Sequence, residues 1–245
     1  MEKVLVLGSG DAFGSFGHMQ SGYFIKGEKG ILLDCGPTIM YALNRASVTT
    51  EDIDIIVLSH FHGDHYAGIP FLLLEAALVS KRTKPLTIIS PEGGEEKIKK
   101  LFELLYPGME EVFRILQLEF LAYNGKDEML FPDLVIRTYP VSHTPQTLPH
   151  GIKIFYHDKC IGYSGDTGWN DNLIEIADNT DLFLCECNYY GIRSESHLNY
   201  IELKEKLPLF NSKRVILTHI GKEMFLNISQ VEHEVADDLK EIILE

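Results

Sequence analysis

Apolar residues recur along the chain with two different periods, and these periods predict alternating strands and helices. The run 53–58 has the length and the β-branched residues of a buried strand, and it ends at the polar Ser59. The stretch 68–80 is apolar enough for a buried helix, whereas 92–106 places its apolar residues on one face, as an amphipathic helix does. The pattern therefore indicates sheets that are covered by helices.

The other predicted elements continue this alternation. They are a strand, a glycine-rich turn and a hairpin around 27–30 within 1–34, a short helix at about 38–45 after Pro37, strands at 85–90 and 215–218, a run of strands over 112–163 that builds a second sheet, and a closing helix from about Gln230. No linker, internal repeat or low-complexity tract interrupts this order. Residues 1–245 are therefore predicted to form one α/β domain, a four-layer αββα sandwich of two sheets with outer helices.

Composition and charge narrow the class of protein. A chain of 245 residues that is 45% hydrophobic can bury a full core, and no stretch approaches the roughly 18 consecutive apolar residues of a membrane span. The formal net charge of −14 argues against a broad electrostatic grip on nucleic acid. The basic clusters at 81–84 and 97–100 are more typical of solvated surface than of a nucleic-acid-binding rim.

The first residues and the cysteines indicate the compartment. Residues 1–7 begin directly as a strand, without the basic region, apolar core and cleavage site of a signal peptide. The four cysteines lie in or beside apolar strands and form no C-x-x-C pair, so we interpret them as buried thiols rather than disulfides or metal ligands. We expect a cytoplasmic protein that does not act on a membrane.

The run His60-Phe61-His62-Gly63-Asp64-His65 carries the strongest chemical signal in the sequence. It follows the predicted strand 53–58, so its side chains are expected on a tight loop at the edge of a sheet. Nitrogen and oxygen ligands so closely spaced suit Zn²⁺, Mn²⁺ or Fe²⁺. A loop that held three histidines and an aspartate by chance would gain little from crowding them without a metal. We therefore predict a divalent metal site here.

Three more ligand-type residues each follow a predicted strand. His143 comes after 134–139, Asp166 after 160–163, and His219 after 215–218. Because strand ends gather at the edge of a sheet, these side chains are expected to converge on the histidine-rich loop.

These residues stand in short motifs that together resemble the metallo-β-lactamase-fold hydrolases. The motifs are the 60–65 run, Leu33-Asp34-Cys35-Gly36, Ser142-His143, Ser164-Gly165-Asp166-Thr167 and Leu217-Thr218-His219, and they span nearly the whole chain. The resemblance implies the αββα fold and two divalent metal ions. It places His60, His62 and His143 on one ion and Asp64, His65 and His219 on the other, with Asp166 bridging both.

Such a pair of ions favours hydrolysis. Divalent ions lower the pKa of a water molecule and stabilise negative charge on a phosphoryl or carbonyl oxygen. Asp64 would orient the attacking oxygen or take its proton through a carboxylate oxygen that faces no metal. The substrate does not follow from this architecture.

His197 narrows the choice of substrate. It lies in Ser196-His197-Leu198-Asn199, before a helix-like segment at 200–206 and upstream of His219. This placement resembles the ribonuclease Z and cyclic phosphodiesterase branches of the superfamily, and it implies that His197 protonates the leaving oxygen or holds the scissile phosphate. A histidine that merely caps the helix is the plain alternative.

The chain also departs from both branches. The 23 positions from His143 to Asp166 leave no room for the long arm with which ribonuclease Z proteins grip transfer RNA, and Asn199 stands where that branch has threonine. The segment 8–22 lacks the cysteines of the extra zinc site found in phosphodiesterases of small cyclic phosphates. A small or cyclic phosphodiester or a short nucleotide is the favoured substrate, and intact transfer RNA is not expected to be processed.

Other functions stay open from the sequence. A ribonuclease Z-like RNA endonuclease would use the same residues. A lactone or thioester hydrolase would use the metals on a carbonyl group, with Tyr163 or Tyr189 assisting the oxyanion and His197 dispensable. A non-catalytic binding module would keep the fold alone, although the complete ligand set disfavours it.

Several remaining features have simpler interpretations. Phe13 occupies the place of the third glycine in a G-x-G-x-x-G motif, so residues 8–17 are interpreted as a loop near the mouth of the site, with His18 facing either the pocket or solvent. His150 and His157 are interpreted as ordinary loop histidines. The apolar tract 70–79 is either a core helix or the contact surface of a homodimer.

Overall fold

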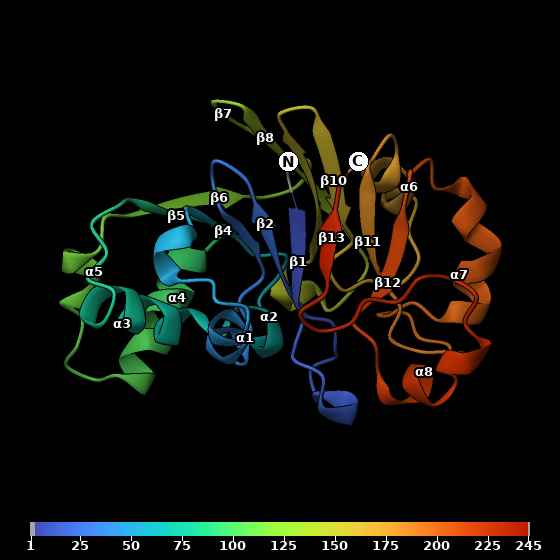
Figure 1. The fold of residues 1–245 in the computed structure, drawn as a ribbon, viewed down its shortest axis with the longest axis horizontal. Coiled ribbons are helices and arrows are strands. Elements are labelled where there is room, and N and C mark those ends of the chain that lie inside the picture. Colours follow the sequence, from blue (N-terminus) through green and yellow to red (C-terminus); the bar gives the residue numbers. More distant parts are fainter. Residues whose placement is uncertain (1–2, 245) are drawn as a thin grey trace.

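The computed structural model describes residues 3–244, and it places two β-sheets face to face between two layers of helices (Figure 1). Within these residues the first sheet has seven strands, in the order β13-β1-β2-β3-β4-β5-β6. Its strands are β1 (Lys3–Gly8), β2 (Gly22–Lys26), β3 (Ile31–Leu33), β4 (Ile55–Val57), β5 (Leu86–Pro91), β6 (Leu118–Tyr123) and β13 (Glu241–Ile243). The predicted αββα arrangement is thus confirmed.

The second sheet has six strands within the described residues, in the order β12-β11-β10-β9-β8-β7. They are β7 (Glu128–Phe131), β8 (Leu134–Pro140), β9 (His150–Tyr156), β10 (Lys159–Tyr163), β11 (Leu182–Glu186) and β12 (Val215–Thr218). The helices are α1 (Ile39–Arg45), α2 (Gly63–Tyr66), α3 (Ile69–Leu78), α4 (Gly94–Leu105), α5 (Val112–Ile115), α6 (Asn172–Ala177), α7 (Tyr200–Lys206) and α8 (Lys222–Leu226).

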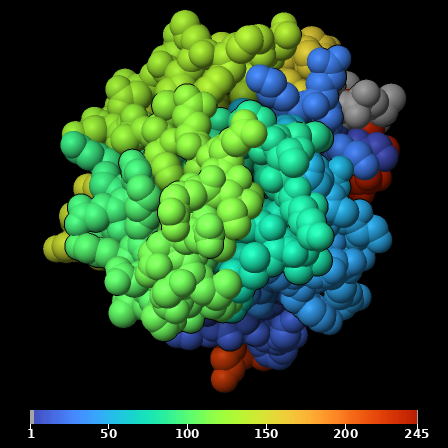
Figure 2. Space-filling model, turned by 90° about the vertical axis from the view of Figure 1, so that its left-hand side faces the viewer, coloured from blue at the N-terminus to red at the C-terminus, as the bar shows by residue number. Residues whose placement is uncertain are grey.

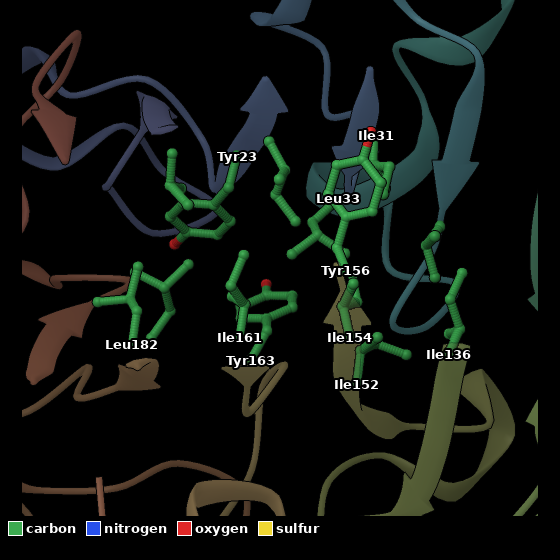
Figure 3. Close-up of a cluster of buried hydrophobic side chains, with 14 of the residues drawn as sticks. Tyr23, Ile31, Leu33, Ile136, Ile152, Ile154, Tyr156, Ile161, Tyr163 and Leu182 are labelled. Atoms are coloured by element: carbon green, nitrogen blue, oxygen red, sulfur yellow. The ribbon is translucent and has the colours of Figure 1, made fainter. Parts of the chain in front are cut away.

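Strand alternation decides which side chains enter the core between the sheets. In β2, Tyr23 and Ile25 point to the second sheet, whereas Phe24 between them packs under the helices. Figure 3 shows Tyr23 and Leu33 of the first sheet facing Ile161 and Tyr163 of the second. The two sheets are therefore held together by a continuous apolar layer, whose burial is the main stabilising term.

The outer faces of the sheets are covered by different helices. Helices α1, α3, α4 and α5 cover the first sheet. Figure 2 shows the teal and green surface of the α3 to α5 segment at this end of the molecule. Helices α6, α7 and α8 pack around the second sheet. The tract 70–79 lies largely in α3, and six residues of this helix are buried, so it is a core helix. Among the described residues, no helix is long and apolar enough to cross a membrane.

The predicted closing helix from Gln230 is wrong. After a short 3-10 turn at Ile228–Gln230, the described residues contain no further helix and lead into β13. The backbone groups of this segment bond to distant strands. The Leu217 amide of β12 donates to the Glu234 carbonyl, and the Ala236 amide donates to the Leu217 carbonyl. The Leu239 amide donates to the Val6 carbonyl. The spacing of the apolar residues favours a helix, but backbone hydrogen bonds to distant strands determine the conformation of this segment.

The predicted run of strands over 112–163 is wrong in its first part. Val112–Ile115 forms the short helix α5, and β6 joins the first sheet in parallel with β5. A parallel neighbour needs a crossover connection, and α4 and α5 provide it. The second sheet begins only at β7.

Candidate metal centre

The predicted site residues lie at the ends of four strands that open on one edge of the sandwich (Figure 1). His60 and His62 follow β4, and Asp64 and His65 lie in α2 directly after them. His143 follows β8, Asp166 follows β10 and His219 follows β12. In the first sheet β4 runs parallel to β3 and β5, and in the second β10, β11 and β12 are parallel, so their carboxyl ends meet at this edge.

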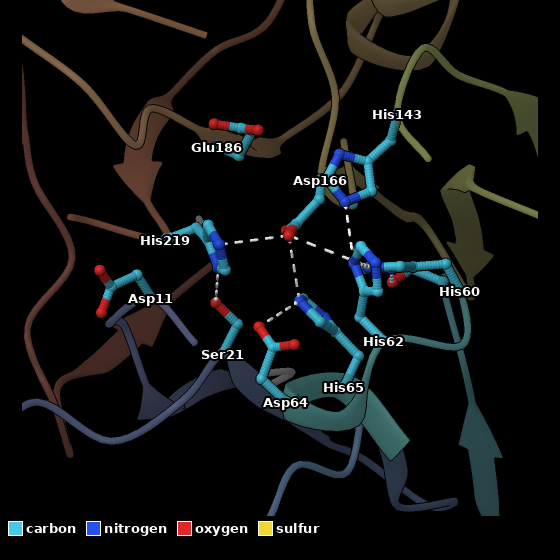
Figure 4. Close-up of polar contacts among 12 residues, drawn as sticks. Asp11, Ser21, His60, His62, Asp64, His65, His143, Asp166, Glu186 and His219 are labelled. Carbon is cyan, nitrogen blue, oxygen red and sulfur yellow. Dashed lines mark hydrogen bonds and ion pairs between the residues drawn. The ribbon is translucent and has the colours of Figure 1, made fainter. Parts of the chain in front are cut away.

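The seven residues form two groups that share one carboxylate. Potential ligand atoms of His60, His62, His143 and Asp166 lie within 4.8 Å of one another, and so do those of Asp64, His65, Asp166 and His219. Asp166 Oδ2 is 3.2 Å from His219 Nε2, 3.3 Å from His65 Nε2 and 3.9 Å from His60 Nε2, as Figure 4 shows. The structure therefore brings together every residue that the sequence predicted for the metals.

Hydrogen bonds outside the groups determine which ring nitrogen His60 and His219 present to the centre. The Ser59 hydroxyl donates to Asp34 Oδ2, so its oxygen accepts from His60 Nδ1 at 2.9 Å. The Ser21 hydroxyl donates to the Gly10 carbonyl, so its oxygen accepts from His219 Nδ1 at 3.0 Å. Each ring thereby turns an unprotonated Nε2 toward Asp166.

Acceptors determine the tautomers of His65 and His143 in the same way. His65 Nδ1 donates to Asp34 Oδ2 at 2.7 Å, and His143 Nδ1 donates to the Ser196 carbonyl at 2.7 Å. Asp34 also accepts from the Tyr163 hydroxyl at 2.7 Å. Metal-binding histidines in proteins are oriented by such partners on their second nitrogen.

The atoms at the centre fit divalent cations. His62 Nδ1 lies 3.2 Å from His60 Nε2 and 2.9 Å from His143 Nε2. In the tautomers described above, the Nε2 atoms of His60 and His143 carry no proton and present only lone pairs. Two further atoms, His65 Nε2 and Asp166 Oδ1, are buried without a hydrogen-bond partner among the described residues. Converging lone pairs and unpaired buried acceptors are costly unless a cation lies between them.

The electrostatics keep Asp166 and His60 in their ligand forms. Burial disfavours the carboxylate of Asp166, but the adjacent His219 and His65 outweigh burial and hold its pKa well below the usual range. Burial and the positive charge of His65 lower the pKa of His60 well below its usual value. An ionised aspartate and a neutral imidazole are the forms that bind a metal. Burial disfavours a charged His65, but Asp166, Asp34 and Asp64 outweigh burial and raise its pKa well above the usual value, so a metal would displace its proton.

His197 lies beside both groups and is held by a buried carboxylate. Its ring stacks on His219 with centroids 5.6 Å apart, and it meets the His143 ring edge-on at 4.8 Å. His197 Nδ1 is 2.8 Å from Glu186 Oε1, at the end of β11. Burial disfavours the imidazolium, but Glu186 outweighs burial and raises the pKa of His197 to about 9.

Glu186 is a residue for which the sequence predicted no role. Its side chain is fully buried, and besides His197 it accepts from the backbone amides of Thr167, Asn188 and Leu198. The available signal was an acidic residue at the end of the apolar run 182–185. Ser21 and Ser59 were missed as well, because their partners are set by the tertiary fold.

Three other histidines stand outside the two groups. His18 lies 3.1 Å from Ser9 Oγ and packs against Phe225, so it fixes the loop before β2. His157 is exposed in a turn, as predicted. His150 is not a loop residue: it begins β9, is buried, and bonds through Nδ1 to the Leu148 carbonyl.

The predictions for the cysteines and tyrosines have different outcomes. All four cysteines are free and buried, as predicted. The Tyr163 hydroxyl is buried against Asp34, so the suggestion that it meets an oxyanion is wrong. Tyr189 is half-buried, and its ring centroid lies 6.0 Å from that of His197.

An open cleft of about 1140 Å³ adjoins the centre at His143. It is lined by the loops around 140–150 and 194–196 and by Trp169.

An αββα sandwich with histidines and aspartates gathered at its strand ends defines the class of metallo-β-lactamase-fold metallo-hydrolases. Comparison with known families narrows this class. Residues 2–235 match the family described as "Anti-Pycsar protein Apyc1", and the chain belongs to that family.

Individual relatives agree with this assignment. Ribonuclease Z of Clostridium beijerinckii is 39% identical over 277 aligned positions, which cover 91% of this chain and 89% of the relative. The metallo-β-lactamase fold protein YhfI from Bacillus subtilis has a TM-score of 0.79 at 21% identity, covering 99% of this chain and 100% of its own. A diphosphatase from the PhnP family has a TM-score of 0.78 at 17% identity, covering 100% and 98%. These two structures show the shared fold, and the predicted superfamily is confirmed.

Proposed function

We propose that this protein is a phosphodiesterase that holds two divalent ions and cleaves a small or cyclic phosphodiester or a short nucleotide. Zn²⁺ and Mn²⁺ suit the nitrogen and oxygen ligands best, and Fe²⁺ suits them too. One ion would be held by His60, His62 and His143 and the other by Asp64, His65 and His219, with Asp166 between them. When bound, the ions would lower the pKa of a water molecule and balance the charge of the phosphoryl oxygens.

The Glu186–His197 pair carries this proposal. Glu186 fixes His197 through Nδ1, so Nε2 is the nitrogen available to a substrate beside both groups. A proton on Nε2 would pass to the leaving oxygen as the phosphorus–oxygen bond breaks. A thiolate leaves a thioester without such help, whereas the alkoxide of a lactone would use the same proton. The ribonuclease Z relative is therefore what favours a phosphodiester over a lactone.

Asp64 completes the proton balance. Its Oδ2 lies 3.1 Å from His65 Nε2, and its side chain keeps a small exposed fraction at the surface of the site. We assign it the role of orienting the attacking water and accepting its proton. The proton gained by Asp64 and the proton lost by His197 balance over one turnover.

A ribonuclease Z-like endonuclease is the second candidate, because a relative of that name is 39% identical over most of the chain. The segment between His143 and Asp166 argues for the smaller substrate. It contains one 3-10 turn, at Pro145–Thr147, and the paired strands β9 and β10, all within the body of the second sheet. No part of this segment projects as an arm.

The test compares wild type with His197→Ala on bis-p-nitrophenyl phosphate and on a panel of lactones, with Zn²⁺ or Mn²⁺ added to metal-stripped protein. We expect the variant to keep the wild-type metal content by elemental analysis and to lose about 10²-fold or more in kcat for the phosphodiester, the usual size of general-acid catalysis. His157→Ala, which removes an exposed histidine, is the matched control. Near-normal kcat in His197→Ala, or lactone turnover indifferent to it, would overturn the proposal.

A further inference from the structure

The chain crosses from the first sheet to the second through a short turn at 124–127, between β6 and β7. This turn contains Asn124-Gly125, the one place in the sequence where glycine follows asparagine. Asn124 also lines the open cleft that reaches His143. A covalent change in the turn would therefore alter both the link between the sheets and the rim of the cleft.

An asparagine that precedes glycine can lose its side-chain amide without an enzyme. The backbone nitrogen of the glycine attacks the side-chain carbonyl carbon, its proton leaves with the amide as ammonia, and a five-membered succinimide ring forms. Water then opens the ring at one of its two carbonyl groups, which gives aspartate or isoaspartate. Glycine favours this attack because it has no Cβ atom to crowd the nitrogen, and asparagine is for this reason a thermolabile residue.

The structure leaves the attacking nitrogen free. The Gly125 amide makes no hydrogen bond within the described residues, whereas the Gly125 carbonyl accepts from the Thr138 hydroxyl at 2.8 Å. Gly125 has a φ of 133°, and a Cβ atom built on it would meet nothing within 4 Å. Residues with a side chain rarely adopt this φ, so the turn favours glycine at the position where glycine also permits the attack.

The amide that would leave is exposed and has one partner. The Asn124 side-chain nitrogen donates to Glu92 Oε2 at 3.0 Å and makes no other hydrogen bond in the described part of the chain. Two other exposed asparagines lack this combination of features. Asn44 lies inside helix α1, where the backbone is held in the helical conformation, and Asn211 is followed by serine, which carries a Cβ atom.

From these observations we infer that Asn124 is a site of spontaneous deamidation, which produces aspartate or isoaspartate on the rim of the cleft. Either product replaces the amide that bonds to Glu92 with a carboxylate. Isoaspartate also adds one carbon atom to the backbone that joins the two sheets. The protein would therefore gain a negative charge beside the candidate metal centre as it ages.

The chemical test follows two tryptic peptides while the native protein ages in warm, mildly alkaline buffer. Peptide 115–126 contains Asn124 as its one asparagine, and peptide 207–213 contains Asn211 as its one asparagine. We expect the first peptide to gain the mass of an amide-to-acid change several-fold faster than the second, and to accept methyl groups from an isoaspartyl methyltransferase. Equal rates in the two peptides, or an unchanged mass of the first, would overturn the inference.

Asn124→Gln is the matched variant for this reaction. It keeps a side-chain amide and the neighbouring Gly125, but its longer side chain would have to form a six-membered ring, which closes more slowly. The mass of peptide 115–126 from this variant should stay constant over the same time. A mass gain at the wild-type rate would assign the reaction to Gln117 and contradict the inference.

A consequence for catalysis follows, and it rests on the proposed function. Asn124→Asp imitates the added charge, which repels an anionic diester at the cleft. We expect the KM for bis-p-nitrophenyl phosphate to rise about 2-fold at low salt, as one solvent-screened charge would cause, and the difference to vanish at high salt. The value of kcat should not change.

Asn211→Asp is the matched control, because Asn211 also donates its amide to a carboxylate, Asp178 Oδ1 at 2.9 Å, but lies outside the cleft. It should leave KM unchanged. Equal KM values for Asn124→Asp and wild type at low salt would refute the consequence for catalysis. Inactive wild-type protein would instead refute the proposed function, while the masses of the two peptides would still decide whether Asn124 deamidates.

Discussion

At the residue scale, four of the five histidines of the centre are oriented by a partner outside the histidine-rich motif, and His62 is the exception. Ser59 fixes His60, Asp34 fixes His65, and Ser21 fixes His219. These partners are buried, and each of them also bonds to a second group that fixes its own orientation. The chemistry of the centre therefore depends on residues that a ligand motif does not contain.

Ser21→Ala tests this dependence. Removing the hydroxyl leaves His219 Nδ1 without its acceptor, so the ring loses its fixed orientation. We expect an affinity about 10-fold weaker for one of the two ions, within the range known for such partners, with little change in the other. Competition with a metallochromic chelator measures both ions. Ser90→Ala, a buried serine bonded only to the Pro91 carbonyl, should bind both ions normally.

The seven ligand-type residues could be predicted because each follows an apolar run, whereas their supporting residues could not. Ser21 and His219 are 198 positions apart, and Glu186 reaches His197 only because β11 ends beside the loop before α7. No local pattern encodes such pairs. Two statements stay predictions: the gathered residues bind ions, and His197 acts on a substrate.

At the element scale, the position of α2 depends on a close backbone approach. A Cβ atom on Gly36 would lie 2.0 Å from the Asp64 carbonyl oxygen, whereas one on Gly63, inside the histidine-rich run, would meet nothing within 4 Å. Gly63, which lies inside the histidine-rich run, is thus easier to replace than Gly36, which lies outside it. The strands β3 and β4 with helix α2 form one packed unit that carries Asp64 and His65.

Gly36→Ala and Gly63→Ala make a matched pair. We expect Gly36→Ala to displace α2, to lower the free energy of unfolding by about 1–3 kcal/mol as overpacking does, and to weaken metal binding. Gly63→Ala should change stability by less than about 1 kcal/mol, because alanine favours the helix. Urea denaturation with elemental analysis measures both. Equal effects of the two changes would contradict this account of the motif.

The segment before β13 shows what the apolar pattern could not predict. Its helical spacing is real, but its backbone bonds go to β12 and β1, and Asp238 accepts from the Ser9 and Met19 amides. Glu234 adds an ion pair with Arg214, before β12, and with Lys240. Hydrogen bonds from Arg214 and Lys240 outweigh burial and lower the pKa of Glu234 to about 2.

A carboxyl group whose pKa is lower in the folded than in the unfolded protein stabilises the folded state at pH values above its unfolded pKa. This stabilisation is lost as the pH falls through the folded pKa. Glu234→Gln should therefore lower the free energy of unfolding by about 1 kcal/mol near pH 7, a size that allows for solvent screening. The difference from wild type should shrink between about pH 4.5 and about pH 2. Urea titrations across this range measure it. The exposed partner Lys100 also lowers the pKa of Glu96 on α4, but solvent screens this pair, so Glu96→Gln should show a much smaller pH-dependent difference.

At the scale of the whole molecule, charge and shape favour a small substrate. The net charge is −14, and the segment between His143 and Asp166 lies within the second sheet. Binding of a long RNA depends on many phosphate contacts with basic side chains. Ions bound by the two groups would make the site locally positive despite this overall charge, enough to hold a single phosphate.

We therefore expect poor cleavage of intact precursor transfer RNA at physiological salt. A gel assay would compare this protein with the Clostridium beijerinckii ribonuclease Z as positive control, at equal concentration and with the same metal. Efficient cleavage at one site near the 3′ end would refute the expectation and favour the second candidate function.

Both ligand groups draw side chains from both sheets, and this arrangement has a consequence for the order of folding. His60, His62, Asp64 and His65 come from the first sheet, whereas His143, Asp166 and His219 come from the second. Neither half of the chain contains a complete set, so an ion bound with full affinity would report that the halves have docked. Metal supply would then act late, as a ligand that stabilises the assembled sandwich by mass action.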